Sequence, residues 1–93
     1  MKIYQSRTFG NKIKKFARQE KEILDDEIKK IAKNPLVGEE KKGDLRGVYV
    51  YKFKIKSIQY LLSYRTVKAA LELIMIGPHE NYYRDLKGYL KRK

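Results

Sequence analysis

The fold is decided by residues 47–78, which read GVYVYKFKIKSIQYLLSYRTVKAALELIMIGP. Over residues 47–56 apolar and basic side chains alternate with a period of two, which is typical of a β-strand with one buried face. Two further apolar segments, 58–66 and 70–76, follow after short turns, and a Gly-Pro pair at 77–78 ends the second. Because connections this short join antiparallel strands, the stretch predicts a three-stranded antiparallel meander.

One short strand and two helices are predicted before the meander. Residues 2–5 read as the strand, with Ser6 and Thr8 as possible helix caps. The apolar stripes of the two helices consist of Phe9, Ile13, Phe16 and Ala17, and then of Leu24, Ile28, Ile31 and Ala32. A break is expected near residues 18–20, and Asn34-Pro35 ends the second helix because the residue before proline avoids the helical region. A joint this short predicts a helix hairpin.

A last helix is predicted after the meander, with an apolar face made of Tyr82, Leu86, Tyr89 and Leu90. The predicted fold class is therefore α+β: an antiparallel sheet of about four strands with an N-terminal helix hairpin and a C-terminal helix. Residues 1–93 are expected to form a single domain, since a chain of this length builds one modest core. The helices are expected to cover one sheet face and to leave the other open.

The composition points to an anionic partner. The chain has 23 Lys and Arg against 11 Asp and Glu, a net charge of +12, and residues 46–93 hold 11 basic and 3 acidic side chains. Nucleic-acid backbones are the commonest partner of such a surface. A solvated basic face or an acidic protein partner would give the same balance.

The sequence disfavours proteins that depend on cysteine chemistry and proteins that are secreted or inserted into a membrane. The absence of cysteine removes disulfides, thiolate metal sites and thiol nucleophiles, and it suits a reducing compartment. No apolar run approaches the ~18 residues of a membrane span, and the N-terminus lacks the apolar stretch of a signal peptide. We therefore expect a cytoplasmic protein with no membrane partner.

A ladder of three lysines is the first candidate binding element. Lys52, Lys54 and Lys56 occupy alternate positions, so a strand would place them about 7 Å apart on one face, a spacing similar to that of RNA phosphates. The alternative is an edge strand kept soluble by lysine. Arg65 is expected to share this open face, where it could pair with a phosphate, or else to form a salt bridge with Glu72 on the neighbouring strand.

The one histidine of the chain, His79, lies in the loop after the last strand, with Tyr83 four residues later. Loops at strand ends often present reactive groups, although a helix-capping or surface role is the usual interpretation of a lone histidine. One histidine and scattered carboxylates do not make a convincing metal site, and phosphate-binding loops and nucleophile elbows are absent from the sequence. We therefore predict neither a metal nor a cofactor.

Several short motifs occur in a characteristic order: NP at 34–35, GDLRG at 43–47, YKFKIK at 51–56, YLLSYR at 60–65 and IGPH at 76–79, followed by Tyr83. This order resembles the RelE/ParE superfamily of bacterial toxins over nearly the whole chain. The resemblance implies a microbial-ribonuclease-like fold and a cognate antitoxin. It also implies one of two activities: the RelE-like branch cleaves mRNA in the ribosomal A site without a metal, whereas the ParE branch poisons DNA gyrase.

The resemblance also suggests roles for individual residues. His79 and Tyr83 match the histidine and aromatic residue of YafQ-like ribonucleases, and Lys52 and Lys54 match basic positions that RelE uses around the scissile phosphate. Two departures stand beside these matches: Leu61 replaces a RelE arginine, and the further histidines of YafQ-like enzymes are missing.

The predicted site follows from these matches. The predicted catalytic residues are His79, Lys54, Arg65 and Tyr83, with Arg65 taking over the missing arginine's role, while Lys52 and Lys56 bind the nucleic acid. Ribosome, mRNA and antitoxin are the expected partners. A ParE-like gyrase inhibitor is the alternative, and a plain nucleic-acid-binding module is the third possibility.

Overall fold

The structure, a computed structural model, describes residues 2–91. Its centre is a five-stranded sheet in the order β1–β5–β4–β3–β2. The strands are β1 (Lys2–Gln5), β2 (Glu39–Glu40), β3 (Tyr49–Ile55), β4 (Ile58–Val67) and β5 (Ala70–Pro78). The helices are α1 (Arg7–Ile13), α2 (Arg18–Lys33) and α3 (Tyr82–Lys91), with a 3-10 turn at Gly43–Leu45. The predicted α+β fold is confirmed, with five strands where about four were expected.

The predicted meander forms from β3, β4 and β5, which pair antiparallel, while β1 adds to β5 in parallel. Ile55 pairs with Ile58, so the first hairpin turn is only two residues long. Lys56 lies in that turn with a positive φ of 57°. The prediction that Lys56 belongs to the alternating ladder is therefore wrong, because the strand ends one residue before it.

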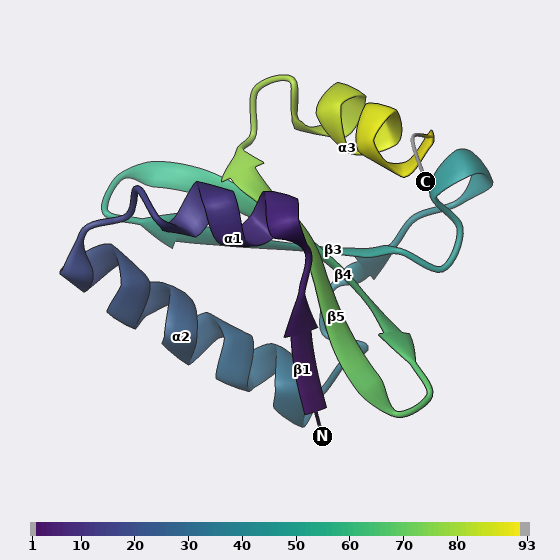
Figure 1. Cartoon of the computed structure of the whole chain (residues 1–93), viewed down its shortest axis with the longest axis horizontal. Coiled ribbons are helices and arrows are strands. Elements are labelled where there is room, and N and C mark those ends of the chain that lie inside the picture. The colour runs from purple at the N-terminus through teal and green to yellow at the C-terminus, as the bar shows by residue number, and fades with distance from the viewer. Residues whose placement is uncertain (1, 92–93) are drawn as a thin grey trace.

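The helix hairpin is confirmed, but its break falls earlier than predicted (Figure 1). Ser6 caps α1, since its Oγ accepts the Phe9 N–H at 3.0 Å. The carboxylate of Glu20 accepts the Ala17 N–H at 2.6 Å and so fixes the start of α2 at Arg18. The Ala17 N–H, at the start of the helix, has no helical carbonyl to bind, and the Glu20 carboxylate takes that place. The break between the helices thus lies before residue 18 rather than at 18–20.

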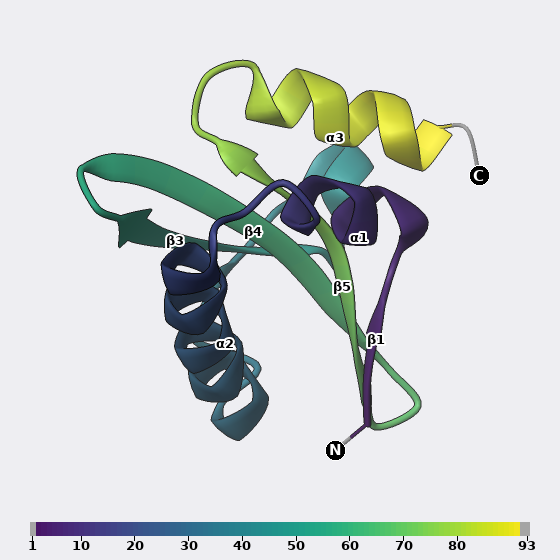
Figure 2. The same cartoon turned by 60° about the vertical axis from the view of Figure 1, so that its left-hand side comes forward.

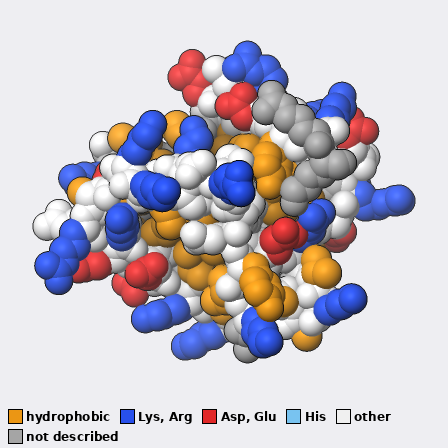
Figure 3. All heavy atoms as spheres, viewed as in Figure 1, with side chains coloured by type: hydrophobic (Ala, Val, Ile, Leu, Met, Phe, Trp, Pro, Cys, Tyr) orange, Lys and Arg blue, Asp and Glu red, His pale blue; other side chains and the backbone are white. Residues whose placement is uncertain are grey.

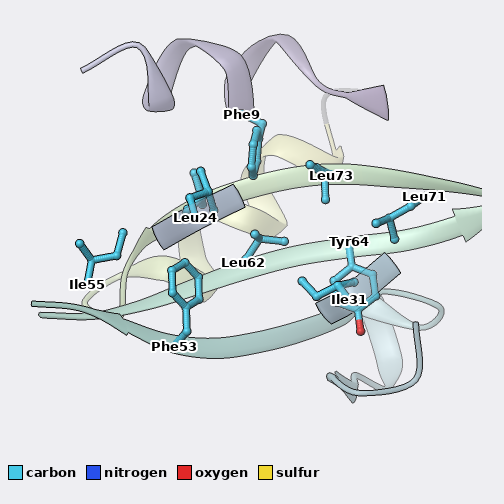
Figure 4. Packing of buried hydrophobic residues seen from close by; sticks show 10 residues of the cluster. Phe9, Leu24, Ile31, Phe53, Ile55, Leu62, Tyr64, Leu71 and Leu73 are labelled. Carbon is cyan, nitrogen blue, oxygen red and sulfur yellow. The ribbon is translucent and has the colours of Figure 1, made fainter. Parts of the chain in front are cut away.

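The main core lies between the helix hairpin and one face of the sheet (Figure 4). Along β3, Phe53 and Ile55 point to this side, toward Leu24 of α2 and Phe9 of α1. The fully buried or nearly buried members of the cluster are Phe9, Leu24, Ile31, Phe53, Ile55, Leu62, Tyr64, Leu71, Leu73 and Ile76. The strand alternation that buries Phe53 and Ile55 sends Lys52 and Lys54 to the other face.

The other face of the sheet was expected to be open, but it is partly covered. α3 packs on it, so α2 and α3 lie on opposite sides of the sheet (Figure 2). A second buried cluster joins α3 to the sheet through Leu45, Val48, Val50, Leu61, Ile74, Met75, Tyr82 and Leu86. The expectation fails because the part of this face around Val50, Leu61 and Ile74 is itself apolar and must be covered. Lys52 and Lys54 stay exposed on the same face.

Candidate nucleic-acid interface

Lys52 and Lys54 of β3 are the first two residues of the candidate site, and the sheet face that they share is called the lysine face below. Both side chains are exposed, and both point away from α1 and α2 because the intervening Phe53 is buried among the core residues on the other side. In the register of the sheet, Lys52 lies opposite Leu61, and Lys54 lies opposite Gln59. The two side chains therefore leave the same strand face from Cα atoms about 7 Å apart.

His79 lies at the same end of the sheet as Lys54. Phe53, which precedes Lys54 in β3, pairs with Tyr60 of β4. On its other side Tyr60 pairs with Pro78 of β5, and His79 directly follows Pro78. Across the sheet, His79 is thus two strand spacings from Lys54, about 10 Å between backbones. The imidazole is exposed, and the His79 carbonyl accepts the Tyr82 N–H at 3.3 Å, which joins the loop to the first turn of α3.

The two tyrosines at the start of α3 have different environments. Tyr82 is 3% exposed, and its hydroxyl lies 2.7 Å from the Met75 carbonyl and 2.9 Å from Ser63 Oγ. Its predicted place in the core is thereby confirmed. Tyr83 is partly exposed and packs edge-on against Tyr82, with ring centroids 5.8 Å apart. Tyr83 is thus the residue of this pair that a substrate can reach.

Lys41 is a site residue that the sequence did not indicate. Its Nζ lies 5.0 Å from the centroid of the Tyr83 ring and 2.5 Å from Glu39 Oε1. The hydrogen bond to Glu39 raises the pKa of Lys41, so this ammonium stays charged at physiological pH. In the sequence Lys41 belongs to a mixed charge cluster in a loop, and only the short strand β2, which pairs with β3, brings it to the lysine face.

Arg65 is not brought together with the other predicted site residues. Its Nε donates to Glu72 Oε1 at 2.5 Å, the salt bridge that was the alternative interpretation. Arg65 pairs with Glu72 near the start of β5, whereas His79 follows the end of β5. Six residues of strand lie between Glu72 and His79, which places their Cα atoms about 23 Å apart. Arg65 instead lines a surface hollow together with Lys2, Tyr4 and Lys68.

Basic charge is also present outside this site. Figure 3 shows Lys and Arg side chains spread over the face that carries α1 and α2, with acidic side chains between them. Within residues 2–91, no group of three or more His, Cys, Asp or Glu side chains could hold a metal ion. None of the helices in this part of the chain is long and apolar enough to span a membrane.

Solved bacterial toxin structures share the fold. In the crystal structure of the intact E. coli RelBE toxin–antitoxin complex, the matching chain has a TM-score of 0.68 at 18% identity, with 85% of this chain and 96% of that chain covered. An arginine double mutant of E. coli RelE in the free state gives 0.72 at 16% identity, covering 97% and 95%. The YoeB/ParE toxin from Agrobacterium tumefaciens gives 0.67 at 22% identity, covering 85% and 99%.

No curated protein sequence matches the chain. A family model does match it, over residues 3–87, and describes the ParE-like toxin of type II bacterial toxin–antitoxin systems. The matched range includes all of the sheet except Lys2, both N-terminal helices and the start of α3, together with every residue placed at the site above. The chain therefore belongs to the ParE-like toxin family of type II bacterial toxin–antitoxin systems, within the RelE/ParE superfamily.

Proposed function

We propose that this toxin is a metal-independent endoribonuclease that cuts mRNA on the ribosome. The observation that carries the proposal is that Lys54 and His79 lie at the same end of the sheet, while Lys52, Lys41 and Tyr83 lie on the sheet face that carries Lys54. Exposed ammonium groups in a row suit a chain of phosphates, and an imidazole beside them can move a proton at neutral pH. Two lysines that match RelE positions are thus combined with a histidine and a tyrosine that match YafQ-like positions, without the RelE arginine that Leu61 replaces.

The lysines would hold the substrate. Lys52 and Lys54 contact successive phosphates of the mRNA, while Lys41 adds a third positive charge next to the Tyr83 ring. Tyr83 then stacks on a base, as aromatic side chains do with unstacked RNA. Lys56, exposed in the turn beyond β3, extends the same basic path. Arg65 is left out of this site, because Glu72 pairs with it at the other end of the sheet.

The proposed reaction is an in-line displacement at phosphorus. The 2′-hydroxyl oxygen attacks the adjacent phosphorus, the P–O2′ bond forms and the P–O5′ bond breaks, which leaves a 2′,3′-cyclic phosphate and a 5′-hydroxyl. His79 donates a proton to the departing O5′ as the general acid. Solvent water accepts the proton of the 2′-hydroxyl, and the ammonium groups of Lys52 and Lys54 stabilise the charge that develops on the phosphoryl oxygens.

Control by an antitoxin is part of the proposal. A similar fold occurs in a complex described as a toxin–antitoxin pair. With a net charge of +12, the free chain attracts acidic segments, so we propose an acidic, partly disordered antitoxin that covers the lysine face. The ribosome as the place of action puts the protein in the cytoplasm.

Inhibition of DNA gyrase is the second candidate function, and the description of the matching family as ParE-like favours it. Two assays separate the candidates. The purified protein is added to ribosomes programmed with a defined mRNA and, in parallel, to DNA gyrase with relaxed plasmid. Cleaved mRNA with undisturbed supercoiling supports the proposed nuclease. Blocked supercoiling with intact mRNA would instead identify a gyrase inhibitor.

A further inference from the structure

Lys41 and Glu39 form an ion pair on the lysine face of the sheet. The Lys41 Nζ lies 2.5 Å from Glu39 Oε1, and the Lys41 side chain is 23% exposed whereas that of Glu39 is 70% exposed. The ammonium is thus held on two sides, by the carboxylate and by the Tyr83 ring 5.0 Å away. The carboxylate, by contrast, faces mostly water.

A second lysine acts on the same carboxylate. Glu39 pairs with Val50 on β3, and Lys52 is the next residue of β3 on that face, within reach of a long side chain across the strands. Glu39 and Lys52 also line one hollow, together with Gly38. The hydrogen bond from Lys41, with the charges of Lys41 and Lys52, lowers the pKa of Glu39. The negatively charged Glu39 therefore lies near both Lys41 and Lys52, two of the cations that the proposed function assigns to RNA binding.

From this geometry we infer that Glu39 is a placeholder for a substrate phosphate: it occupies the anion position at Lys41 and Lys52 in the free toxin, and an RNA phosphate displaces it. Carboxylate and phosphate oxygens accept the same hydrogen bonds from an ammonium group. An exposed lysine–carboxylate pair is weak in water, so a phosphate surrounded by several lysines can replace it. This inference rests on the proposed function, since it takes RNA as the ligand of this face.

The neighbouring residue supplies a matched control. Glu40 follows Glu39 in β2, so its side chain points to the opposite face, where the Tyr49 hydroxyl donates to it at 3.4 Å. The variants Glu39→Gln and Glu40→Gln remove the same charge from adjacent positions. Only the first removes a carboxylate from Lys41 and Lys52.

The test is the binding of a fluorescent single-stranded RNA whose 2′-hydroxyls are methylated, so that it cannot be cleaved. We expect Glu39→Gln to bind this RNA about two- to five-fold more tightly than Glu40→Gln, the range that one exposed ion pair allows. Adding Lys41→Met, which keeps the apolar stem beside Tyr83, should remove most of that gain. Equal affinities of the two glutamine variants, or weaker binding by Glu39→Gln, would overturn the placeholder.

Failure of the underlying function gives a different result. If Lys52→Ala and Lys54→Ala bind the methylated RNA as tightly as the wild type does, the lysine face is not an RNA site, and the proposed function fails together with the inference. If those two variants lose affinity while Glu39→Gln and Glu40→Gln match each other, only the placeholder is wrong. Thermal unfolding of each variant confirms that the chain remains folded.

Discussion

The Gly38 amide donates a hydrogen bond of 2.9 Å to the hydroxyl of Tyr64, and this contact positions the segment that carries Glu39 and Lys41. The same hydroxyl donates to the Pro35 carbonyl at 2.7 Å. A buried residue of β4 thus holds both ends of the turn between α2 and β2. The site on the lysine face therefore depends on a core side chain that points to the opposite face of the sheet.

Gly38→Ala should damage this contact. A Cβ at Gly38 would lie 2.7 Å from the Tyr64 hydroxyl and 3.1 Å from the Val50 carbonyl, so the turn must move. We expect the free energy of unfolding in urea to fall by about 1–3 kcal/mol, a usual loss for overpacking. Gly88→Ala in α3 is the control, since its Cβ would meet nothing within 4 Å. An unchanged stability of Gly38→Ala would show that the turn adapts freely.

Tyr82→Phe should destabilise the attachment of α3. The substitution removes the hydroxyl that bonds the Met75 carbonyl and Ser63 Oγ, both of which lie in the buried interior. We expect a loss of about 1–2 kcal/mol in the free energy of unfolding, because the remaining buried polar groups keep fewer partners. Tyr4→Phe, at a ring that is 55% exposed, should stay within about 0.5 kcal/mol of the wild type. Equal effects of the two would contradict the structure.

Alkaline pH should weaken the fold. Burial, with a hydrogen bond to Glu27, raises the pKa of Tyr51 to about 12, and burial raises the pKa of Tyr82 above its ordinary range. Both pKa values exceed the unfolded value of about 10, so the unfolded state releases these protons first as the pH rises. The tyrosine contribution is therefore complete below about pH 10 and declines above it.

Urea midpoints measured from about pH 9 to about pH 11.5 test this dependence. The double variant Tyr51→Phe/Tyr82→Phe, which lacks both ionising hydroxyls, should lose stability with pH more gradually than the wild type does. Parallel pH profiles of the two proteins would mean that these hydroxyls are not shielded from water in the folded chain.

Ala69→Gly should stabilise the protein. Lys68 and Ala69 form the two-residue turn between β4 and β5, and both have positive φ, 50° and 64°. Left-handed backbone is unfavourable for an L-residue with a Cβ, so glycine at position 69 should add about 1 kcal/mol to the free energy of unfolding. The reverse is expected for Ala32→Gly inside α2, with a loss of about 1 kcal/mol. A less stable Ala69→Gly would refute the turn geometry.

The sequence predicts β1 and the antiparallel meander of β3, β4 and β5, because the alternation in β3 and the short turns that bound β4 and β5 are local signals. It also predicts the buried Tyr82 from its helical spacing to Leu86. It does not predict β2. The start of α2 was misplaced because the Glu20 cap is one side-chain bond with no periodic pattern. The sequence does not predict that α3 packs on the second face of the sheet, because the apolar stripe of α3 can be buried against either face.

The candidate site was only partly predictable for a related reason. The side of Lys52 and Lys54 follows from alternation within one strand, whereas the partner of Arg65 depends on the register between β4 and β5. Lys41 enters the site through β2, a strand of two residues that is too short to give a pattern. Contacts between distant segments, here Lys41 and Tyr83, cannot be obtained from spacing along the chain.

The central claim is that His79 and the lysine face cleave mRNA, and single-turnover cleavage on programmed ribosomes tests it most directly. His79→Ala should lower the cleavage rate about 10²- to 10⁴-fold, the usual contribution of a general acid, while ribosome affinity stays nearly unchanged. Lys54→Ala should weaken binding as well as rate, and its binding should depend less steeply on salt than that of the wild type. Cleavage by His79→Ala at the wild-type rate would contradict the assignment of His79, and intact mRNA with the wild-type protein would contradict the nuclease itself.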